Sequence, residues 1–246
     1  MLALEKGRYR SRLCSGAEDI RAAQRLRYRS FIDAEGDGLD ADRFDDICQH
    51  VLIEEEGVAG PVGCFRLLSL PDGSAITQSY SAQFYDLSAL AGIGAPLLEL
   101  GRFCIRADRM DPDILRLAWG ALTRFVDTRK VAMLFGCSSF RGTDPAPYRD
   151  AFAVLGARHL APEARRPAPR ALETYGFAAD LIGHEPDPRE ALRRMPPLLR
   201  TYLLMGGWVS DHAVIDRGLG TLHVFTGLEI GAIPQQRARL LRGVAA

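Results

Sequence analysis

Long hydrophobic runs are missing from this sequence. Its longest apolar stretches, at 131–135 and 198–204, end at charge or glycine well short of the roughly 20 residues that a membrane-spanning helix needs. The first residues, MLALEKGRYRSRLC, carry charges within a few positions and have neither the continuous apolar core nor the cleavage site of a secretory signal. We therefore predict no transmembrane helix and a cytoplasmic location.

Cysteine and lysine are also scarce. The five cysteines are widely spaced, without a CxxC pair or histidines at ligand spacing, which argues against a disulfide framework and against a metal site. Lys6 and Lys130 are the only lysines, and the formal net charge is zero, so no nucleic-acid partner is expected. The excess of arginine fits either a GC-rich genome or the binding of phosphate and carboxylate ligands by guanidinium groups.

The hydrophobic content is sufficient for one sizeable core. With 246 residues and 47% hydrophobic content, the chain lies at the top of the range for one domain. Apolar spacing and cap residues predict a helix at 17–31, strands at 50–54 and 60–70 forming a hairpin, a strand at 97–105, a helix at 113–130, a strand at 131–137 and a helix at 148–155. This order favours an α/β fold with a crossover connection.

Two segments have no apolar period. Residues 33–42 (DAEGDGLDAD) are expected to form an exposed, mobile loop, and residues 159–171, rich in proline and arginine, a surface connection. The chain after them is predicted to be helical at 189–205, around Pro196 and Pro197, and strand-like at 208–216 and 221–230. We expect a core domain at 1–158, a surface connection at 159–188 and a C-terminal subdomain at 189–246 that completes the sheet.

Four short motifs place polar residues where a fold alone would not need them. They are LRYRSF at 26–31, DRFDD at 42–46, GCFRLL at 63–68 and LELGRFCI at 98–105. Charged residues inside apolar strands, such as Glu99 and Arg102, need a partner or a functional reason, because an isolated buried charge is costly. These motifs therefore indicate a functional site.

In this order the motifs resemble the bacterial L-ornithine N(alpha)-acyltransferase family of ornithine lipid biosynthesis and, more distantly, the acyl-homoserine-lactone synthases. The likeness continues through LFGCSSFRGTDP at 134–145 and MPPLLRTYLLMGGWVSDHAVID at 195–216, so it spans nearly the whole chain. It implies a GNAT fold, with a mixed, mostly antiparallel central sheet flanked by helices and a C-terminal extension. The implied reaction transfers a 3-hydroxyacyl group from acyl carrier protein to the α-amine of L-ornithine and forms lyso-ornithine lipid.

The resemblance assigns catalysis to Glu99 and Arg102. Glu99 matches the strand glutamate of the lactone synthases and is expected to accept the amine proton, directly or through water. Arg102 would project to the opposite face if the strand pleat is regular, whereas a bulge, common here in GNAT sheets, would change that. A buried ion pair that joins the strand to a helix is the structural alternative for both residues.

The resemblance assigns substrate binding to Arg27, Phe31, Asp42, Asp45 and Arg66. Arg66 lies in an apolar strand and needs a partner, and Asp42 or Asp45 are the candidates. Together these groups could bind the carboxylate and side-chain ammonium of ornithine, or they could only clamp the loop over the cleft. For Phe31, ordinary core packing is the alternative.

The donor site is assigned to Phe103, Ile105, Arg106, Arg109 and Ser138. GNAT enzymes usually place a glycine-bearing loop after this strand to hold the donor phosphate, but residues 106–113 contain no glycine and three aspartates. That charge disfavours coenzyme A. It is compatible with the 4'-phosphopantetheine arm of acyl carrier protein, whose acidic surface Arg106 and Arg109 could meet. No permanently bound cofactor is expected, and Ser138 has no GxSxG context of a nucleophile.

The sequence is also compatible with other functions. They are acylation of glutamine or glycine, lactone formation, and non-catalytic binding of acyl carrier protein. The lactone synthases carry a tryptophan soon after the first helix, and residues 33–42 have none. The mixture of arginines and leucines at 192–205 suits either a packed amphipathic helix or peripheral contact with the inner face of a membrane.

Overall fold

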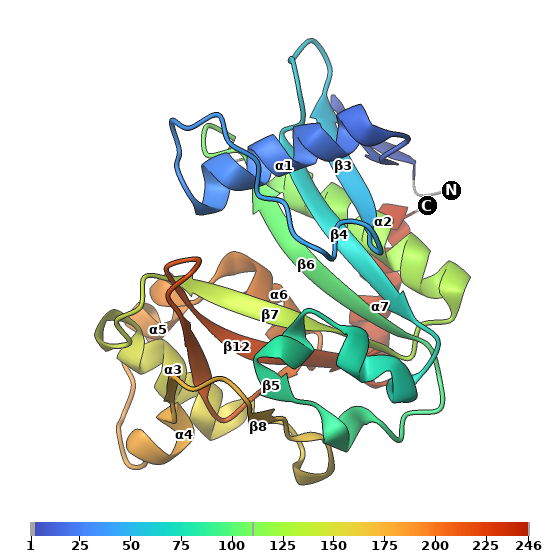
Figure 1. Cartoon of the computed structure of the whole chain (residues 1–246). Coiled ribbons are helices and arrows are strands. Elements are labelled where there is room, and N and C mark those ends of the chain that lie inside the picture. Colours follow the sequence, from blue (N-terminus) through green and yellow to red (C-terminus); the bar gives the residue numbers. More distant parts are fainter. Residues whose placement is uncertain (1–2, 110, 246) are drawn as a thin grey trace. The chain divides into compact units, whose positions relative to one another are not determined.

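A computed structural model describes residues 3–109 and 111–245 (Figure 1). The chain forms two compact units, each built from segments that are not contiguous in sequence. Unit 1 contains the residues up to Ser69, Leu98–Val131 and the residues from Gln235 on, and unit 2 contains Leu70–Leu97 and Ala132–Pro234. The three-part division predicted from the sequence does not coincide with these units, because the C-terminal helix packs on α2 and so returns to unit 1.

Unit 1 contains a sheet in the order β1-β2-β3-β4-β6, in which the first four strands are antiparallel neighbours. Its strands are β1 (Leu4–Lys6), β2 (Tyr9–Leu13), β3 (Gln49–Glu55), β4 (Gly63–Leu70) and β6 (Leu97–Ile105), and its helices are α1 (Ala17–Phe31), α2 (Pro112–Arg129) and α7 (Gln235–Ala245). The predicted helix at 17–31, the β3–β4 hairpin and the strand at 97–105 are confirmed.

Helices α1 and α2 cover opposite faces of this sheet (Figure 1, blue and green). Leu52 and Cys64 are paired across β3 and β4 and pack with Leu26 of α1. The next pair along, Ile53 and Gly63, faces the other way, where Ile114 of α2 lies 3.6 Å from the position of a Cβ on Gly63. Because side chains alternate along a strand, Arg66 also lies on the α1 face, and so does its partner His50.

Unit 2 contains an antiparallel sheet in the order β7-β12-β11-β9, with β10 also paired to β12. Its elements are β5 (Tyr85–Asp86), β7 (Met133–Arg141), α3 (Arg149–Arg158), β8 (Ala168–Pro169), β9 (Thr174–Tyr175), α4 (Phe177–Asp180), α5 (Pro188–Arg194), α6 (Pro197–Leu204), β10 (Trp208–Val209), β11 (Ala213–Asp216) and β12 (Thr221–Glu229), with short 3-10 turns at Gly73–Gln78, Ser81–Gln83 and Ser88–Leu90. The predicted strand at 208–216 is therefore two strands.

The predicted surface connection at 159–171 is only partly confirmed. Much of it is exposed, but Leu160 forms a parallel bridge with Val209, and Ala161 is buried. Further on, β8 pairs with β5, and the backbone N–H groups of Arg170 and Ala171 donate to the carbonyl of Phe84. The segment is held because its backbone groups find partners in neighbouring strands.

Helices α5 and α6 bury one side against the core of unit 2. Met195 and Leu199 belong to that core, whereas Leu192 and Leu204 are exposed. Packing of this amphipathic segment is confirmed, and contact of its exposed side with a membrane stays a prediction. Within 3–109 and 111–245, no helix combines the length and the apolar character that crossing a bilayer requires.

One face of the unit 2 sheet carries a buried polar cluster. The hydroxyl of Tyr85 donates to the carbonyl of His223 at 2.8 Å and lies 3.0 Å from Nδ1 of the same histidine. Phe84 packs edge-on against the His223 ring, and the His212 ring is tilted against that of Tyr85. Burial lowers the pKa of His223 from 6.5 to about 4, with a smaller opposing effect of Asp216 and a further lowering by His212.

This burial predicts an acid sensitivity of unfolding. Below pH 6.5 the unfolded chain binds a proton at His223 that the folded chain does not bind until about pH 4. The free energy of unfolding should therefore fall by about 3 kcal/mol more in the wild type than in His223→Leu between pH 7 and pH 4. Urea titrations at the two pH values measure this difference, and equal losses in both proteins would contradict it.

Candidate functional site

Six charged side chains of unit 1 form a closed cycle on the α1 face of the sheet. Three arginines come from regular elements, namely α1, β4 and β6, and three aspartates come from the loop between α1 and β3. Each aspartate binds two arginines and each arginine binds two aspartates. We call this cycle the ionic ring; its members in order are Arg27, Asp40, Arg102, Asp42, Arg66 and Asp45.

The distances in the ionic ring are those of charge-assisted hydrogen bonds. Arg27 donates from Nε to Asp40 at 2.9 Å and from both Nη atoms to Asp45 at 2.8 and 2.9 Å, and Nη2 also donates to the backbone carbonyl of Asp40. Arg66 binds Asp42 with both Nη atoms, at 2.6 and 2.8 Å. These fork-to-fork pairs are the strongest geometry for arginine and carboxylate.

The remaining contacts close the ring. Nη1 of Arg66 donates to Asp45 at 2.8 Å. Arg102 donates from Nε to Asp40 at 2.9 Å and from Nη2 to Asp42 at 3.3 Å. Arg66 thus binds both Asp42 and Asp45, whereas the sequence predicted either one as its partner. The charges of the ionic ring sum to zero.

Two uncharged partners complete the environment of Asp45. Gln24, one turn before Arg27 on α1, donates from Nε2 to Asp45 at 2.8 Å, and Nε2 of His50 lies 3.1 Å from its backbone carbonyl. Sequence reasoning missed Gln24, His50 and Asp40. Gln24 could have been found from its position three residues before Arg27, on the same helix face. Nothing in the sequence distinguishes Asp40 from the other acids of the loop.

The ionic ring is largely removed from water. The side chains of Arg27 and Arg66 are 1% and 3% exposed, and that of Arg102 is 10% exposed. Burial alone would raise the pKa of Asp45, but hydrogen bonds from Arg27 and Gln24 outweigh it and hold the pKa well below its usual value. Asp42 behaves in the same way, with the hydrogen bond from Arg66 as the largest lowering effect.

The loop between α1 and β3 is more ordered than predicted. Its first part, residues 33–35, is exposed as expected, but Asp40 is buried in the ionic ring. Gly36 and Gly38 lie against the ring of Tyr28, where a Cβ would come within 2.5 and 2.4 Å of its carbon atoms. The prediction of an exposed loop is therefore wrong at Asp40, which its ion pairs bury, whereas Leu39 and Ala41 on either side of it are exposed as predicted.

Strand β6 departs from a regular pleat at Arg102. This residue has φ of 51°, in the left-handed region that a non-glycine residue rarely adopts. A bulge is the alternative to a regular pleat that was expected from the sequence here, and this departure agrees with it. The changed backbone direction lets the guanidinium of Arg102 reach Asp40 and Asp42. Gly101 faces Arg66, because a Cβ at this position would lie 3.5 Å from Nε of the arginine, an ordinary van der Waals contact.

Glu99 lies on the same side of the sheet as the ionic ring. Burial raises the pKa of Cys48 to about 12, and its charged neighbours include both Arg66, which lowers that pKa, and Glu99, which raises it. The Glu99 side chain is itself buried, with the residue 4% exposed. A base must come within hydrogen-bond distance of the proton it accepts, so the catalytic role of Glu99 stays a prediction.

The other predicted site residues are not gathered at the ring. Phe31 packs against the small core of Ala23, Leu26 and Leu52, in agreement with the packing alternative. Phe103 stacks on Phe65 with ring centres 5.8 Å apart, and Ile105 is half-buried at the end of β6. Ser138 belongs to unit 2, where the hydroxyl of Thr226 donates to it at 2.9 Å.

Arg106 and Arg109 lie in the acidic loop after β6, of which Met110 is outside the described residues. Arg106 donates from Nε to Asp108 at 2.7 Å, and Arg109 donates to Asp108 at 2.8 Å and to Glu55 at 2.7 Å. The carboxylate of Asp111 caps α2 by accepting the N–H of Asp113. Both arginines are therefore neutralised by neighbouring acids, and their binding of a donor stays a prediction.

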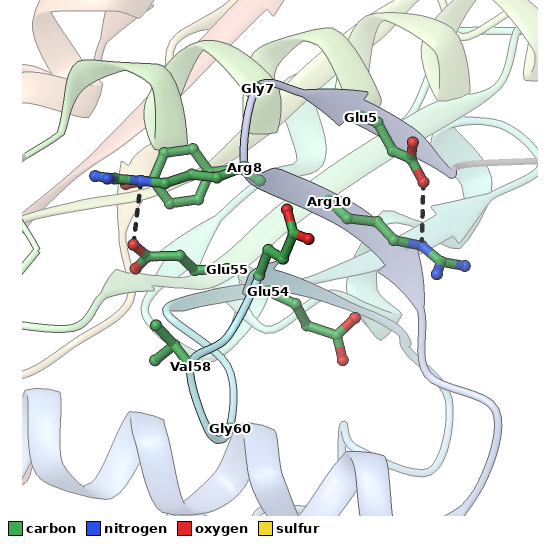
Figure 2. A pocket seen from close by; sticks show the side chains of 10 residues that line it. Glu5, Gly7, Arg8, Arg10, Glu54, Glu55, Val58 and Gly60 are labelled. Carbon is green, nitrogen blue, oxygen red and sulfur yellow. Dashed lines mark hydrogen bonds and ion pairs between the residues drawn. The ribbon is translucent and has the colours of Figure 1, made fainter.

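A groove of about 520 Å³ is lined in part by Glu55, the partner of Arg109 (Figure 2). It is formed by the turn between β1 and β2 and by the end of β3, and its lining includes Glu5, Arg8, Arg10, Glu54 and Glu55. Arg8 pairs with Glu55 and Arg10 with Glu5, and Glu54 is held by Arg12 outside the groove. The lining contains none of the predicted catalytic residues. Within the described parts of the chain, no group of three or more side chains is arranged to bind a metal ion.

The fold and this arrangement define a class of protein. Residues 26–120 match the family model described as Acetyltransferase (GNAT) domain. This range contains all members of the ionic ring and Glu99. The mixed α/β architecture with a mostly antiparallel sheet is that of this class, so the protein is an N-acyltransferase with the GNAT fold.

Comparison with individual proteins narrows the class. The chain is 36% identical to an L-ornithine N(alpha)-acyltransferase of Rhodobacter capsulatus, over 93% of this chain and 92% of that one. It is 34% identical to the L-ornithine N(alpha)-acyltransferase of Brucella abortus, over 90% and 84% of the two chains. The protein therefore belongs to the L-ornithine N(alpha)-acyltransferase family. Among solved structures, FeeM, an N-acyl amino acid synthase from uncultured soil microbes, is 13% identical, with a TM-score of 0.49 over 97% of both chains.

The ionic ring predicts a large effect of a single charge removal. Asp45→Asn keeps the shape of the side chain but leaves Arg27 and Arg66 without a shared counter-charge, and the loss of one partner from a buried pair costs about 3 to 5 kcal/mol. Chemical denaturation at pH 7 measures this loss.

The matched control is Glu18→Gln, which removes an exposed ion pair between Glu18 and Arg21 on helix α1. Such a pair contributes about 0.5 kcal/mol or less. Equal losses in the two variants would show that the ionic ring does not stabilise the fold.

Proposed function

We propose that the protein transfers a 3-hydroxyacyl group from acyl carrier protein to the α-amine of L-ornithine and forms lyso-ornithine lipid. The observation that carries the proposal is likeness along nearly the whole chain to L-ornithine N(alpha)-acyltransferases, of which four match. A likeness that continued only through the GNAT core would support acyl transfer in general, but not this acceptor. The segments outside residues 26–120 are shared with these relatives as well.

The acidic loop after β6 supports acyl carrier protein as the donor. Asp108 and Asp111 have pKa values below the ordinary range, the first because of its hydrogen bond from Arg106 and the second because of the backbone N–H of Asp113. Both carboxylates are therefore ionised at neutral pH. Residues 106–113 carry three aspartates against two arginines, a net charge of −1, which disfavours the more highly charged pyrophosphate of coenzyme A. A 4'-phosphopantetheine arm brings a single phosphodiester and meets less repulsion.

The reaction requires a free amine beside an activated carbonyl. The α-ammonium of ornithine loses one proton to a base, and its nitrogen attacks the thioester carbon. The C–S bond then breaks, and the second nitrogen proton passes to the departing sulfur, which leaves as the thiol. Glu99 is the proposed acceptor of the proton, because it is a carboxylate near Arg66 on the face that carries the ionic ring. The thioester is already activated, and holding the two reactants together lowers the barrier further.

Within the ionic ring, Asp42 is the member best exposed to a ligand. Its side chain is 23% exposed, against 6% for Asp45 and 7% for Asp40. We assign to Asp42 the recognition of the ornithine side-chain ammonium, while the buried members hold Asp42 in place. Asp42 keeps its negative charge at neutral pH, because Arg66 and Arg102 lower its pKa despite its burial.

The function is tested with purified protein, 3-hydroxyacyl carrier protein and L-ornithine. Mass spectrometry should detect the mono-acylated α-amide, and coenzyme A thioesters should react much more slowly. Parallel reactions with glutamine and glycine test the acceptor. A product with either of these and none with ornithine would overturn the assignment, and faster reaction with coenzyme A thioesters would overturn the donor.

Glu99→Gln should lower kcat by about 100-fold or more, because the amide cannot accept the amine proton. Binding of the carrier protein should be unchanged, and an unchanged thermal midpoint would show that the fold is kept. Glu163→Gln, at an exposed glutamate of unit 2, is the control. A rate equal to that of the control would remove Glu99 from the role of base.

Asp42→Asn should raise the KM for ornithine by about tenfold or more with a smaller change in kcat, as the loss of a charge-assisted hydrogen bond predicts. Diaminobutyrate and lysine, which place the side-chain ammonium at other distances, serve as competing acceptors. A fall in stability as large as that of Asp45→Asn, with an unchanged KM, would reduce Asp42 to a structural member of the ionic ring.

A further inference from the structure

Three of the five cysteines gather beneath α1 in unit 1. Cys64 on β4 and Cys104 on β6 belong to a small apolar cluster with Ala23, Leu26 and Leu52, and Cys14 packs against it. Cys64 and Cys104 are 1% and 6% exposed. Neither thiol has a part in the acyl transfer proposed above.

The thiols of Cys64 and Cys104 are already in contact. Their Sγ atoms lie 3.5 Å apart, on strands that are neighbours in the sheet order. A disulfide has an S–S length of about 2.05 Å, so the two atoms need to approach by roughly 1.5 Å. The backbone is close here as well, because the position of a Cβ on Gly63 is only 3.3 Å from the carbonyl oxygen of Cys104.

We propose that Cys64 and Cys104 are a redox-sensitive pair that closes a reversible disulfide between β4 and β6. With a hydroperoxide as the oxidant, one thiolate attacks the peroxide oxygen, the O–O bond breaks, and a sulfenic acid forms. The second sulfur attacks that sulfenic sulfur, the S–O bond breaks, and water leaves. Two thiols and one hydrogen peroxide give one disulfide and two waters.

The neighbouring cysteines compete poorly for the oxidant. Burial raises the pKa of Cys14 to about 12 and that of Cys48 to about 12, which suppresses their reactive thiolate forms. The contact between the two sulfurs instead lowers the pKa of Cys104 and raises that of Cys64, so Cys104 is the member of the pair that supplies the attacking thiolate. The oxidant reaches the pair when α1 opens locally, so the reaction is slower than at an exposed thiol.

The pair lies two residues from the ionic ring on each strand. Arg66 follows Cys64 by two positions, and Arg102 precedes Cys104 by two. Both arginines bind Asp42, at 2.6 and 3.3 Å. Drawing the strands together at the cysteines changes the separation of these guanidinium groups, so the disulfide lowers the activity that the ring supports.

The test uses the intact folded protein and hydrogen peroxide. All five cysteines are free in the reduced protein, and the thiol count should fall from five to three. Peptide mapping should identify one Cys64–Cys104 link, which dithiothreitol reverses. Cys137→Ala should form the same link, and Cys64→Ala should not. A link from Cys14 to Cys104, or oxidation confined to Cys14, Cys48 and Cys137, would overturn the proposal, and the wild-type map decides this even if a variant fails to fold.

The effect on activity rests on the function proposed above. The oxidised protein should be at least tenfold less active with ornithine and should recover on reduction. A mapped disulfide with unchanged activity would overturn the regulatory part of the proposal. Failure of the reduced protein to acylate ornithine would count against the proposed function, while the mapped link would still stand.

Discussion

Each carboxylate of the ionic ring binds two guanidinium groups, and the arrangement of the site depends on these shared ion pairs. Three positive and three negative side chains are buried together, and burial of any one alone would be unfavourable by several kcal/mol. The cycle is stable because every member has two counter-charges, and a hydrogen-bond network in low dielectric is strengthened by its closure. It joins α1, β4, β6 and the loop before β3 into one rigid part of unit 1.

This constraint explains local features that are unfavourable by themselves. Arg102 adopts a left-handed backbone conformation, which costs a non-glycine residue about 1 to 2 kcal/mol, and the two ion pairs it thereby makes offset that cost. Gly36 and Gly38 let the loop approach Tyr28. The site is thus held by backbone choices in two segments, β6 and the loop between α1 and β3.

The same constraint separates two kinds of residue in the site. Arg27, Asp45 and Arg66 are almost fully buried, whereas Asp42 keeps enough exposure for the contact with a ligand proposed above. Acyl transfer from a thioester needs few groups beyond these, because the acyl carbon is already activated and the amine needs only to be placed and deprotonated. A neutral ring therefore suits this chemistry, since it orders the site without adding net charge.

Most local elements and the family could be predicted from the amino-acid sequence. Helix α1 and strand β6 were predicted with their boundaries, because periodicity and end residues are local signals, and the order of the motifs indicated the acyltransferase family. It also indicated that Arg66 needs an acidic partner, because a charge in an apolar strand cannot remain unpaired.

Contacts between residues far apart in the chain could not be predicted in this way. Asp40 is one of several similar acids in its loop, and its place in the ionic ring follows from the path of the backbone between α1 and β3. Cys64 and Cys104 come within 3.5 Å because β4 and β6 are neighbours, and the return of α7 to α2 placed the end of the chain in unit 1. Such contacts depend on strand order and packing over tens of residues, which no local pattern of side chains encodes.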